Sequence, residues 1–444
     1  MLAAVDPDAP EQLSLEDLHD AWSLLVPEDR VESFRALART DAEDLFLLLS
    51  SRDQAELLFS IPSTERRAWI RLLAPDDAAD LIQEVEPEQR EVVLALLDDQ
   101  NRRDVVALLA YAEDDAGGLM NPRYARVRPE MTIDEAITYL RRQAAERTES
   151  LPYAYVLDHD QMLRGVVSYR ELFTAKPGQR VEEVMAVDVV SVPEAMDQEE
   201  VSQLFTTTRL LAIPVIDADG RMKGIVTLDD VVDVVREEAT EDIQKIGGTA
   251  VLEAPYLQVT PLDMIRKRGG WLAVLFVGET LTAAAMGHFQ TEIAKAVALA
   301  LFIPLVISSG GNSGGQATTL VIRAMALGEV RLRDWWRVVR REFFSGLGLG
   351  AVLALLGFAQ VALLHRVSGA YGPHYLGLGA TLAVSLVGVV LWGTMVGSML
   401  PFLLRRLNLD PATASAPFVA TLVDVTGLMI YFTAARLILT GTLL

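Results

Sequence analysis

The hydrophobic positions in the first quarter of the chain recur with the period of an α-helix. Between residues 15 and 109, apolar residues stand three or four positions apart in short runs, separated by prolines such as Pro27, Pro62 and Pro75. Proline fits the first turn of a helix, where its missing N–H is not needed, so each proline marks the start of a new helix. The pattern predicts an all-α, superhelical domain of short helices over residues 1–120.

A different pattern occurs twice between residues 121 and 239. Each copy has a short β-stretch and a helix, followed by two apolar strands around an Asp- or Gly-rich turn and by a closing helix. The strand pairs lie in LPYAYVLD with LRGVVSYREL, and in LAIPVID with GRMKGIVTLDDV. Short polar turns between β-branched runs are typical of hairpins. We predict two similar α+β modules over residues 121–180 and 181–239.

Five long apolar stretches occupy the last part of the chain. Each has enough residues to cross a hydrocarbon core of about 30 Å as a helix. They predict a five-helix membrane domain over residues 266–444, joined to the second α+β module by a connecting helix at residues 240–265. The stretches cover approximately residues 270–286, 293–322, 343–366, 376–404 and 412–440.

Charge divides the chain at the same place and orients the predicted helices. The net formal charge of −22 consists of −29 over residues 1–265 and +7 over residues 266–444. Most of the later Lys and Arg residues lie at 266–268, 323–341 and 405–406, so the positive-inside rule places the N-terminus in the cytoplasm and the C-terminus outside. The first residues, MLAAVDPDAPEQL, lack the basic and apolar regions of a signal peptide. We therefore expect a protein of the inner or plasma membrane with cytoplasmic N-terminal domains.

Composition excludes several classes of function. The chain has no cysteine, which excludes disulfides, zinc fingers and thiolate catalysis. Its five histidines do not form a spacing such as HExxH, so any bound metal is held by oxygen, which favours Mg²⁺, Ca²⁺ or Mn²⁺. The acidic half would repel nucleic acid. Because the sequence has no nucleophile–base constellation and no phosphate-binding loop, we do not expect an enzyme.

Asp424 stands near the middle of the last apolar stretch. A carboxylate at that depth costs about 2.5–3.5 kcal/mol or more, so it is rare unless it faces a cavity or an ion. By helical periodicity it shares a face with mostly small residues, which would leave width for an ion beside one fixed charge. Mg²⁺ keeps several of its waters, so this face suits Mg²⁺ better than a tight cage would. The face comprises Pro417, Ala420, Thr421, Asp424, Gly427 and Leu428.

The second apolar stretch contains SSGGNSGGQ, a segment that would weaken an isolated helix. Its four glycines are tolerable either where neighbouring helices pack closely or where the backbone lines a water-filled path. Close packing explains most of the glycines. Asn312 and Gln316 stand four residues apart and fit a polar path better, because both side chains would lie on one face.

Two acidic groups that precede the membrane domain are candidate cation sites. Asp76 and Asp80 share a helix face, either as a solvated surface or as part of a weak divalent-cation site. Further along, six acids follow one another at spacings that destabilise a helix unless something neutralises them, and Arg236 and Lys245 are too few to do so. These six are Asp230, Asp233, Glu237, Glu238, Glu241 and Asp242.

The two α+β modules resemble a tandem pair of CBS (cystathionine-β-synthase-type) modules. The resemblance rests on the order of a Pro-Val-apolar-Asp strand, a G-[VI]-V-[ST] strand and an acid that opens the next helix. It implies pairing into dimers and the binding of an adenine nucleotide such as ATP, with ribose contacts from hydroxyl–acid pairs. Such pairs are also typical of helix N-caps that bind no ligand. Here they are Ser168 with Glu171 and Thr227 with Asp230.

Over its whole length the chain is similar to the MgtE-type magnesium channels. The motifs DDAGGLMNP, EEATEDIQKIGG, RGGWL, SSGGNSGGQ and DPATASAPFVATLVD carry the resemblance and occur in this order. The family implies a homodimer in the lipid bilayer, with the pore between the subunits. It also implies a helix near residues 240–262 that plugs the cytoplasmic mouth while Mg²⁺ is bound between the acidic cytosolic domains.

The resemblance also implies roles for individual residues. Asp424 matches the pore carboxylate, and Asn312, Pro417, Ala420 and Thr421 would line the pore. The regulatory metal ligands would be Asp410, Glu238, Glu241 and Asp242 near the plug, Asp230 and Asp233 beside the CBS pair, and Asp76 and Asp80 in the N-terminal domain. The nucleotide contacts would be Tyr153, Arg170, Thr227 and Asp230.

The function that these features predict is Mg²⁺-selective, Mg²⁺-gated uptake of magnesium. Two alternatives stay open. A secondary carrier of divalent cations would depend on a Na⁺ or H⁺ gradient. A membrane-anchored CBS nucleotide sensor would have no need of Asp424 or of a polar SSGGNSGGQ segment within the membrane.

Overall fold

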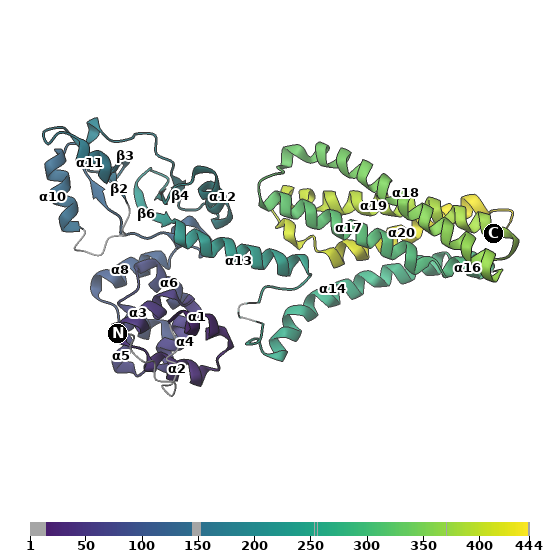
Figure 1. Cartoon of the computed structure of the whole chain (residues 1–444), viewed down its shortest axis with the longest axis horizontal. Coiled ribbons are helices and arrows are strands. Elements are labelled where there is room, and N and C mark those ends of the chain that lie inside the picture. The colour runs from purple at the N-terminus through teal and green to yellow at the C-terminus, as the bar shows by residue number, and fades with distance from the viewer. Residues whose placement is uncertain (1–14, 144–151, 253, 255, 370, 443–444) are drawn as a thin grey trace, which may run out of the picture. The chain divides into compact units, whose positions relative to one another are not determined.

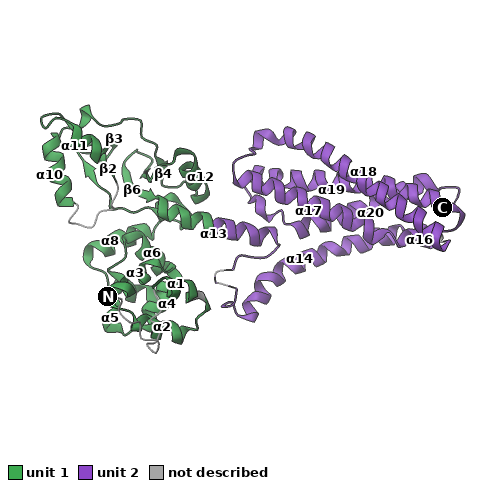
Figure 2. Cartoon of the chain, in the orientation of Figure 1, with its two compact units in different colours: residues 1–236 green, residues 237–444 purple. Residues whose placement is uncertain are grey.

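The computed structural model describes residues 15–143, 152–252, 254, 256–369 and 371–442 (Figure 1). The chain divides into two compact units at the bond between Arg236 and Glu237 (Figure 2). The first unit holds the short helices and both small sheets, and the second holds the long helices. The fold is therefore the predicted series of an all-α domain, two α+β modules and a five-helix membrane domain.

The N-terminal part of the first unit is a stack of short helices. Proline occupies the first turn of α2, α6 and α7, as the prolines of the sequence predicted. Trp69 lies at the centre of the stack, with its ring centroid 4.9 Å from that of Phe34 and 5.4 Å from that of Phe46. The helices are α1 (Leu15–Ala21), η1 (Trp22–Leu24), α2 (Pro27–Ala36), α3 (Arg39–Leu48), α4 (Ser51–Ser60), α5 (Ser63–Ile70), α6 (Pro75–Gln83), α7 (Pro87–Leu94), α8 (Asp99–Leu108) and α9 (Ala116–Leu119).

Two three-stranded sheets follow, and they repeat the same topology. In each, a short first strand pairs in parallel with the middle strand, which pairs antiparallel with the third. The registers correspond, because Tyr153 faces Ser168 in one hairpin as Ala212 faces Thr227 in the other. This repetition confirms the two predicted modules. Their elements are β1 (Arg126–Val127), α10 (Ile133–Gln143), β2 (Tyr153–Leu157), β3 (Leu163–Ser168) and α11 (Tyr169–Thr174), then η3 (Val181–Glu183), β4 (Val192–Pro193), α12 (Gln198–Thr208), β5 (Ala212–Ile216), β6 (Met222–Thr227) and α13 (Leu228–Ile246).

Among the described residues, five helices are long and apolar enough to cross a membrane. They correspond to the five predicted stretches. Helices α17, α19 and α20 pack together, α18 packs on α19, and α14 packs on α20 (Figure 1). The elements of this part are α14 (Pro261–His288), α15 (Gln290–Lys295), α16 (Val297–Ala300), α17 (Ile303–Ala326), η4 (Leu332–Asp334), α18 (Trp335–Ser368), η5 (Gly372–His374), α19 (Tyr375–Arg406), η6 (Pro411–Thr413) and α20 (Ala416–Leu439).

The connecting helix is shorter than the predicted 240–265. Helix α13 ends at Ile246, and Gly248 follows in the left-handed conformation (φ +72°) that commonly terminates a helix. The next helix begins at Pro261, where the side chain of Thr260 accepts a hydrogen bond from the Asp263 N–H (3.2 Å). A glycine stop and a capped proline start therefore divide the segment into the ends of two helices.

Glycines on two facing helices allow α17 and α19 to approach each other closely. A Cβ atom on Gly393 would collide with the carbonyl oxygen of Gly310, and one on Gly397 would collide with that of Gly314. The hydroxyl of Thr318 donates a hydrogen bond to the Gly397 carbonyl oxygen across the same interface (2.8 Å). This confirms that part of the glycine-rich segment serves close helix packing.

The substitution Gly393→Leu should lower the thermal unfolding temperature of the detergent-purified protein. The larger side chain has to push α17 away from α19, and overpacking of this kind costs about 1–3 kcal/mol or more. Gly348→Leu is the matched control, because a Cβ on Gly348 meets no atom within 4 Å. Equal unfolding temperatures for the two variants would contradict the packing role of Gly393.

Candidate functional site

A cavity of about 990 Å³ lies between α17 and α20, where the two polar membrane segments meet. Small residues form the part of its wall where α17 faces α20: ideal Cβ positions on Gly311 and Gly315 lie 3.3 Å from the Cβ atoms of Ala420 and Ala416. Asp424 lines the cavity, with its Oδ1 atom 4.0 Å from the Cβ position of Gly311. The cavity is therefore a space with small-residue walls and one fixed carboxylate.

The polar side chains of α17 line the same cavity. Asn312 and Gln316 are both lining residues, and the amide of Asn312 donates a hydrogen bond to the hydroxyl of Ser308 (3.3 Å). Of the α20 residues predicted to line a pore, Pro417 and Ala420 lie on this cavity with Asp424. The structure thus brings together most of the residues that the sequence placed on an ion path.

The residues of the predicted face of α20 do not all lie on the cavity: some pack against α14 and others against α19. The methyl group of Thr421 faces Gly278 of α14, 2.8 Å from the ideal Cβ position of that glycine, and its hydroxyl donates to the Pro417 carbonyl oxygen (3.1 Å). Gly427 is buried against Val389 of α19. Thr421 therefore lies outside the residues that line the cavity.

Glu279 of α14 is a second membrane carboxyl group, which sequence reasoning missed. Its side chain is in hydrogen-bond contact with that of Asp424. Gly278 and Thr421 bring α14 and α20 together one residue away from Glu279. The signal that singled out Asp424, an acid within a long apolar stretch, applies equally to Glu279.

Acidic side chains of α6 and α13 lie close together within the first unit. Asp76 is 7% exposed, and its Oδ1 atom has no hydrogen-bond partner. Burial, and then the neighbouring carboxylates of Asp77 and Asp230, raise the pKa of Asp76 well above its usual value. Burial is also the main reason that the pKa of Asp230 rises to about 7, although the Thr227 hydroxyl donates to its carboxylate. This cluster is short of positive charge.

Other predicted acids surround the C-terminal end of α13. The ammonium group of Lys245 contacts the carboxylates of Glu241 and Asp410, at 2.6 Å for Asp410 Oδ2. Burial, followed by the charges of Asp410 and Glu238, raises the pKa of Asp242 to about 6. Within the described residues, no group of three or more His, Asp or Glu side chains is arranged to hold a metal ion.

A smaller cavity of about 250 Å³ lies beside the sheet of the first CBS-like module. Tyr153, Ser168, Glu171 and Asp188 are among its lining residues, and the Tyr153 hydroxyl donates to the Ala212 carbonyl oxygen (3.4 Å). Ser168 and Glu171 form a capping box at the start of α11. The same cavity is therefore lined by the aromatic ring of Tyr153 and by the first hydroxyl–acid pair, Ser168 with Glu171.

The other predicted nucleotide contacts lie elsewhere. Arg170 is exposed and is not among the residues that line this cavity, and neither are Thr227 and Asp230. The last two residues bond to each other, because the Thr227 hydroxyl and N–H both donate to the Asp230 carboxylate (3.2 Å for the N–H). This second hydroxyl–acid pair faces the acids of α6 instead.

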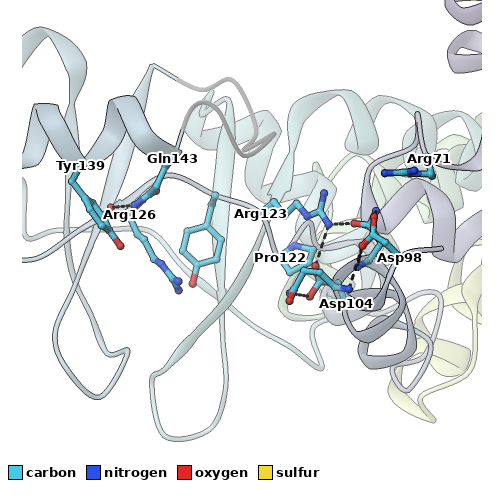
Figure 3. A pocket seen from close by; sticks show the side chains of 11 residues that line it. Arg71, Asp98, Asp104, Pro122, Arg123, Arg126, Tyr139 and Gln143 are labelled. Atoms are coloured by element: carbon cyan, nitrogen blue, oxygen red, sulfur yellow. Dashed lines mark hydrogen bonds and ion pairs between the residues drawn. The ribbon is translucent and has the colours of Figure 1, made fainter.

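A polar pocket of about 700 Å³ in the first unit contains none of the predicted site residues (Figure 3). Two of its charged side chains pair within the protein: the guanidinium of Arg123 contacts Asp104 (3.3 Å) and also the Asn101 side chain. Asp98 accepts hydrogen bonds from the first backbone N–H groups of α8, which lower its pKa. These satisfied groups stabilise the junction between α8 and the first module.

Known protein families match successive parts of the chain. Residues 13–114 match the MgtE intracellular N domain, residues 116–178 and 181–237 match the CBS domain, and residues 303–434 match MgtE, described as a divalent cation transporter. The magnesium transporter MgtE of Thermus thermophilus is 44% identical over 342 residues, which are 77% of this chain and 74% of that protein. The magnesium transporter MgtE of Bacillus subtilis is 34% identical over 74% of this chain and 70% of that protein.

Among solved structures, the cytosolic domain of the Mg²⁺ channel MgtE in complex with ATP is 40% identical. The match covers 50% of this chain and 91% of the solved chain, with a TM-score of 0.47. The sequence relationship to the full-length transporters extends across both units of the present chain. The protein therefore belongs to the MgtE family of magnesium transporters, as an integral membrane protein with an intracellular N-terminal domain and not as an enzyme.

Proposed function

We propose that the protein is a Mg²⁺-selective channel for magnesium uptake, gated by Mg²⁺ on the cytoplasmic side. The observation that carries this proposal is the cavity between α17 and α20, with Asp424 on its small-residue wall. Mg²⁺ holds its water shell tightly and is usually bound through one or two carboxylates. A wide cavity with a fixed acid suits such a hydrated ion.

The pore itself requires a second copy of the chain. Helices α17 and α20 supply one wall, and a two-fold axis beside them would supply an identical wall with its own Asp424. A homodimer agrees with α14, of which no residue is buried within this chain although it lies among the described residues. With the N-terminal domain intracellular, the run of basic residues at 331–341 supports a C-terminus on the outside.

The regulatory acids supply the gate. Asp76, Asp77 and Asp230 lie near one another with little compensation, so at low Mg²⁺ their repulsion favours separation of α6 from the start of α13. Mg²⁺ that binds to the associated arrangement, with Asp80 and Asp233 as further ligands, shifts the population towards it. The Mg²⁺ concentration in the cytoplasm would in this way control the channel.

A gradient-coupled carrier is the second candidate function. The contact between the carboxyl groups of Glu279 and Asp424 favours it, because paired acids within a membrane are typical of proton relays. The two functions differ in whether Mg²⁺ flux persists when no H⁺ or Na⁺ gradient is present. Persistence of flux identifies the channel.

ATP is a proposed regulatory ligand of the first CBS-like module. The ring of Tyr153 offers a surface for the adenine base, and the free capacity of the Glu171 carboxylate offers an acceptor for the ribose hydroxyls. Arg170 lies on the surface next to Glu171, where it could reach the phosphates.

The substitution Asp424→Asn should abolish Mg²⁺ uptake into proteoliposomes without lowering the unfolding temperature. The amide keeps the size of the side chain and removes its charge. Glu329→Asn is the control, since Glu329 is an exposed acid in a loop. Undiminished Mg²⁺ flux in the Asp424→Asn protein would contradict the role of Asp424 in the ion path.

Acidification should stabilise the metal-free protein between pH 8 and pH 6. The pKa of Asp230 is raised in the folded protein from 3.8 to about 7, so the stability is complete below the ordinary pKa and is lost as the pH rises towards and through 7. In EDTA, we expect the unfolding temperature to rise by roughly 2–4 °C from pH 8 to pH 6, as for a change of about 1 kcal/mol.

The same measurement has an internal control. Addition of Mg²⁺ at pH 8 should raise the unfolding temperature as acidification does. In the Asp230→Asn protein, both Mg²⁺ and acidification should raise the unfolding temperature by less. A pH response that is unchanged in Asp230→Asn would mean that other groups cause it.

The substitution Tyr153→Ala should weaken ATP binding to the full-length protein roughly tenfold, because stacking of a base on an aromatic ring contributes about 1–3 kcal/mol. Isothermal titration calorimetry measures this affinity directly. Tyr139→Ala is the control, since Tyr139 is exposed on α10 outside the cavity. Equal ATP affinities in the two variants would exclude Tyr153 as the nucleotide contact.

A further inference from the structure

The C-terminal end of α13 carries a positively charged side chain that contacts two carboxylates. Lys245 lies in the last turn of α13, and its ammonium group is 2.6 Å from Oδ2 of Asp410, the residue that caps η6. The same ammonium contacts the carboxylate of Glu241, one helical turn earlier. Its side chain is 26% exposed, so water screens this contact only in part.

Apolar contacts beside Lys245 hold the same end of the helix. Ile246 packs against the cluster of Ile322, Ala412 and Ala414, which joins the end of α17 to the η6 turn. Gly248 follows in the left-handed conformation, and its ideal Cβ position is 3.3 Å from Cγ of Pro417. The end of α13 therefore contacts the first turn of α20, the helix that carries Asp424.

The geometry determines which cation these carboxylates accept. A hydrated Mg²⁺ needs carboxylate oxygens that are free to replace or bind its waters. At Glu241 and Asp410 an ammonium group already donates to those oxygens. Because Lys245 belongs to the same helix, its local concentration does not depend on the cytoplasmic Mg²⁺ concentration.

Two neighbouring acids add negative charge to this end of the helix. Glu238 and Asp242 lie on the same helix, and the pKa of Asp242 rises to about 6 through burial and through the charges of Asp410 and Glu238, with Lys245 opposing the rise.

We propose that Lys245 is a resident cation that positions the end of α13 on the first turn of α20 in the absence of Mg²⁺. It takes the place that Glu241 and Asp410 would otherwise offer to a regulatory Mg²⁺. The consequence for gating rests on the Mg²⁺-gated channel proposed above. Lys245 sets a basal level of closure, and cytoplasmic Mg²⁺ adds to it.

Planar-bilayer recording of Lys245→Met tests this role. Methionine keeps the length of the side chain and removes its charge, which leaves Glu241 and Asp410 to repel each other. We expect a roughly 2- to 5-fold higher open probability without Mg²⁺, the range for loss of a partly exposed ion pair. Saturating Mg²⁺ should still close the channel, along a steeper concentration curve, because two further carboxylates become Mg²⁺ ligands.

Three further variants separate the role of charge from a folding defect. Lys245→Arg should behave as the unmodified protein, and Lys245→Met combined with Asp410→Asn should fall between the unmodified protein and Lys245→Met, because the repulsion is gone but the ion pair is not restored. Lys223→Met is the matched control, since Lys223 forms a similar pair with Asp217 in the second α+β module (3.2 Å). Equal Mg²⁺-free open probability in Lys245→Met and Lys223→Met overturns the proposal.

A readout without transport separates the failure of this proposal from failure of the gating mechanism. The chain has no cysteine, so Ile246→Cys with Ala412→Cys gives one reactive pair for a short bifunctional crosslinker. In EDTA, crosslinking should be efficient with Lys245 and at least threefold weaker in the Lys245→Met background. Equal crosslinking overturns the positioning role, whereas an unmodified channel that never responds to Mg²⁺ overturns only the gating mechanism.

Discussion

Carboxylates that are withdrawn from water need a counter-charge, and this requirement governs three places in the chain. At the start of α13, Asp230 meets the buried Asp76 with no cation beside them. At the end of the same helix, Lys245 meets Glu241 and Asp410. In the membrane, Asp424 meets Glu279. Among these three described groups, a cation of the protein contacts the carboxylates at the end of α13.

Small residues make this electrostatic arrangement sterically possible. Gly310 and Gly314 bring α17 against α19, and the intervening Gly311 and Gly315 leave room in front of Ala416 and Ala420. One helix therefore packs tightly on one side and leaves a cavity on the other. The glycines of the SSGGNSGGQ segment therefore divide between two faces, of which one packs on α19 and the other borders the cavity.

Much of the fold could be predicted because periodic patterns determine it. The five membrane helices follow from the lengths of apolar runs, and the two sheets follow from a repeated strand–turn–strand pattern. The candidate site was harder, because a single helix face of α20 was expected to line a pore. Packing against α14 and α19 removes Thr421 and Gly427 from that face, and no periodicity within α20 specifies where its neighbours lie.

The residues that escaped prediction are those defined by a contact between distant segments. Glu279 matters because α14 places it on Asp424, 145 positions later in the chain. Lys245 was counted as too little charge for six acids, which is correct as a sum. The structure shows that Lys245 contacts two carboxylates, those of Glu241 and Asp410. Asp410 is not one of the six acids.

The position of α20 connects these observations. Its first turn contacts Gly248 through Pro417, and its middle carries Asp424 seven residues later, which is about 10 Å along a helix. A helical segment of about two turns transmits a displacement of its first turn with little loss, because its backbone hydrogen bonds are already satisfied internally. Movement of the end of α13 would therefore reach the membrane carboxylate through one rigid element. In the channel that we propose, gating and permeation would need no longer pathway than this, since α20 would supply the contact for one and the charge for the other.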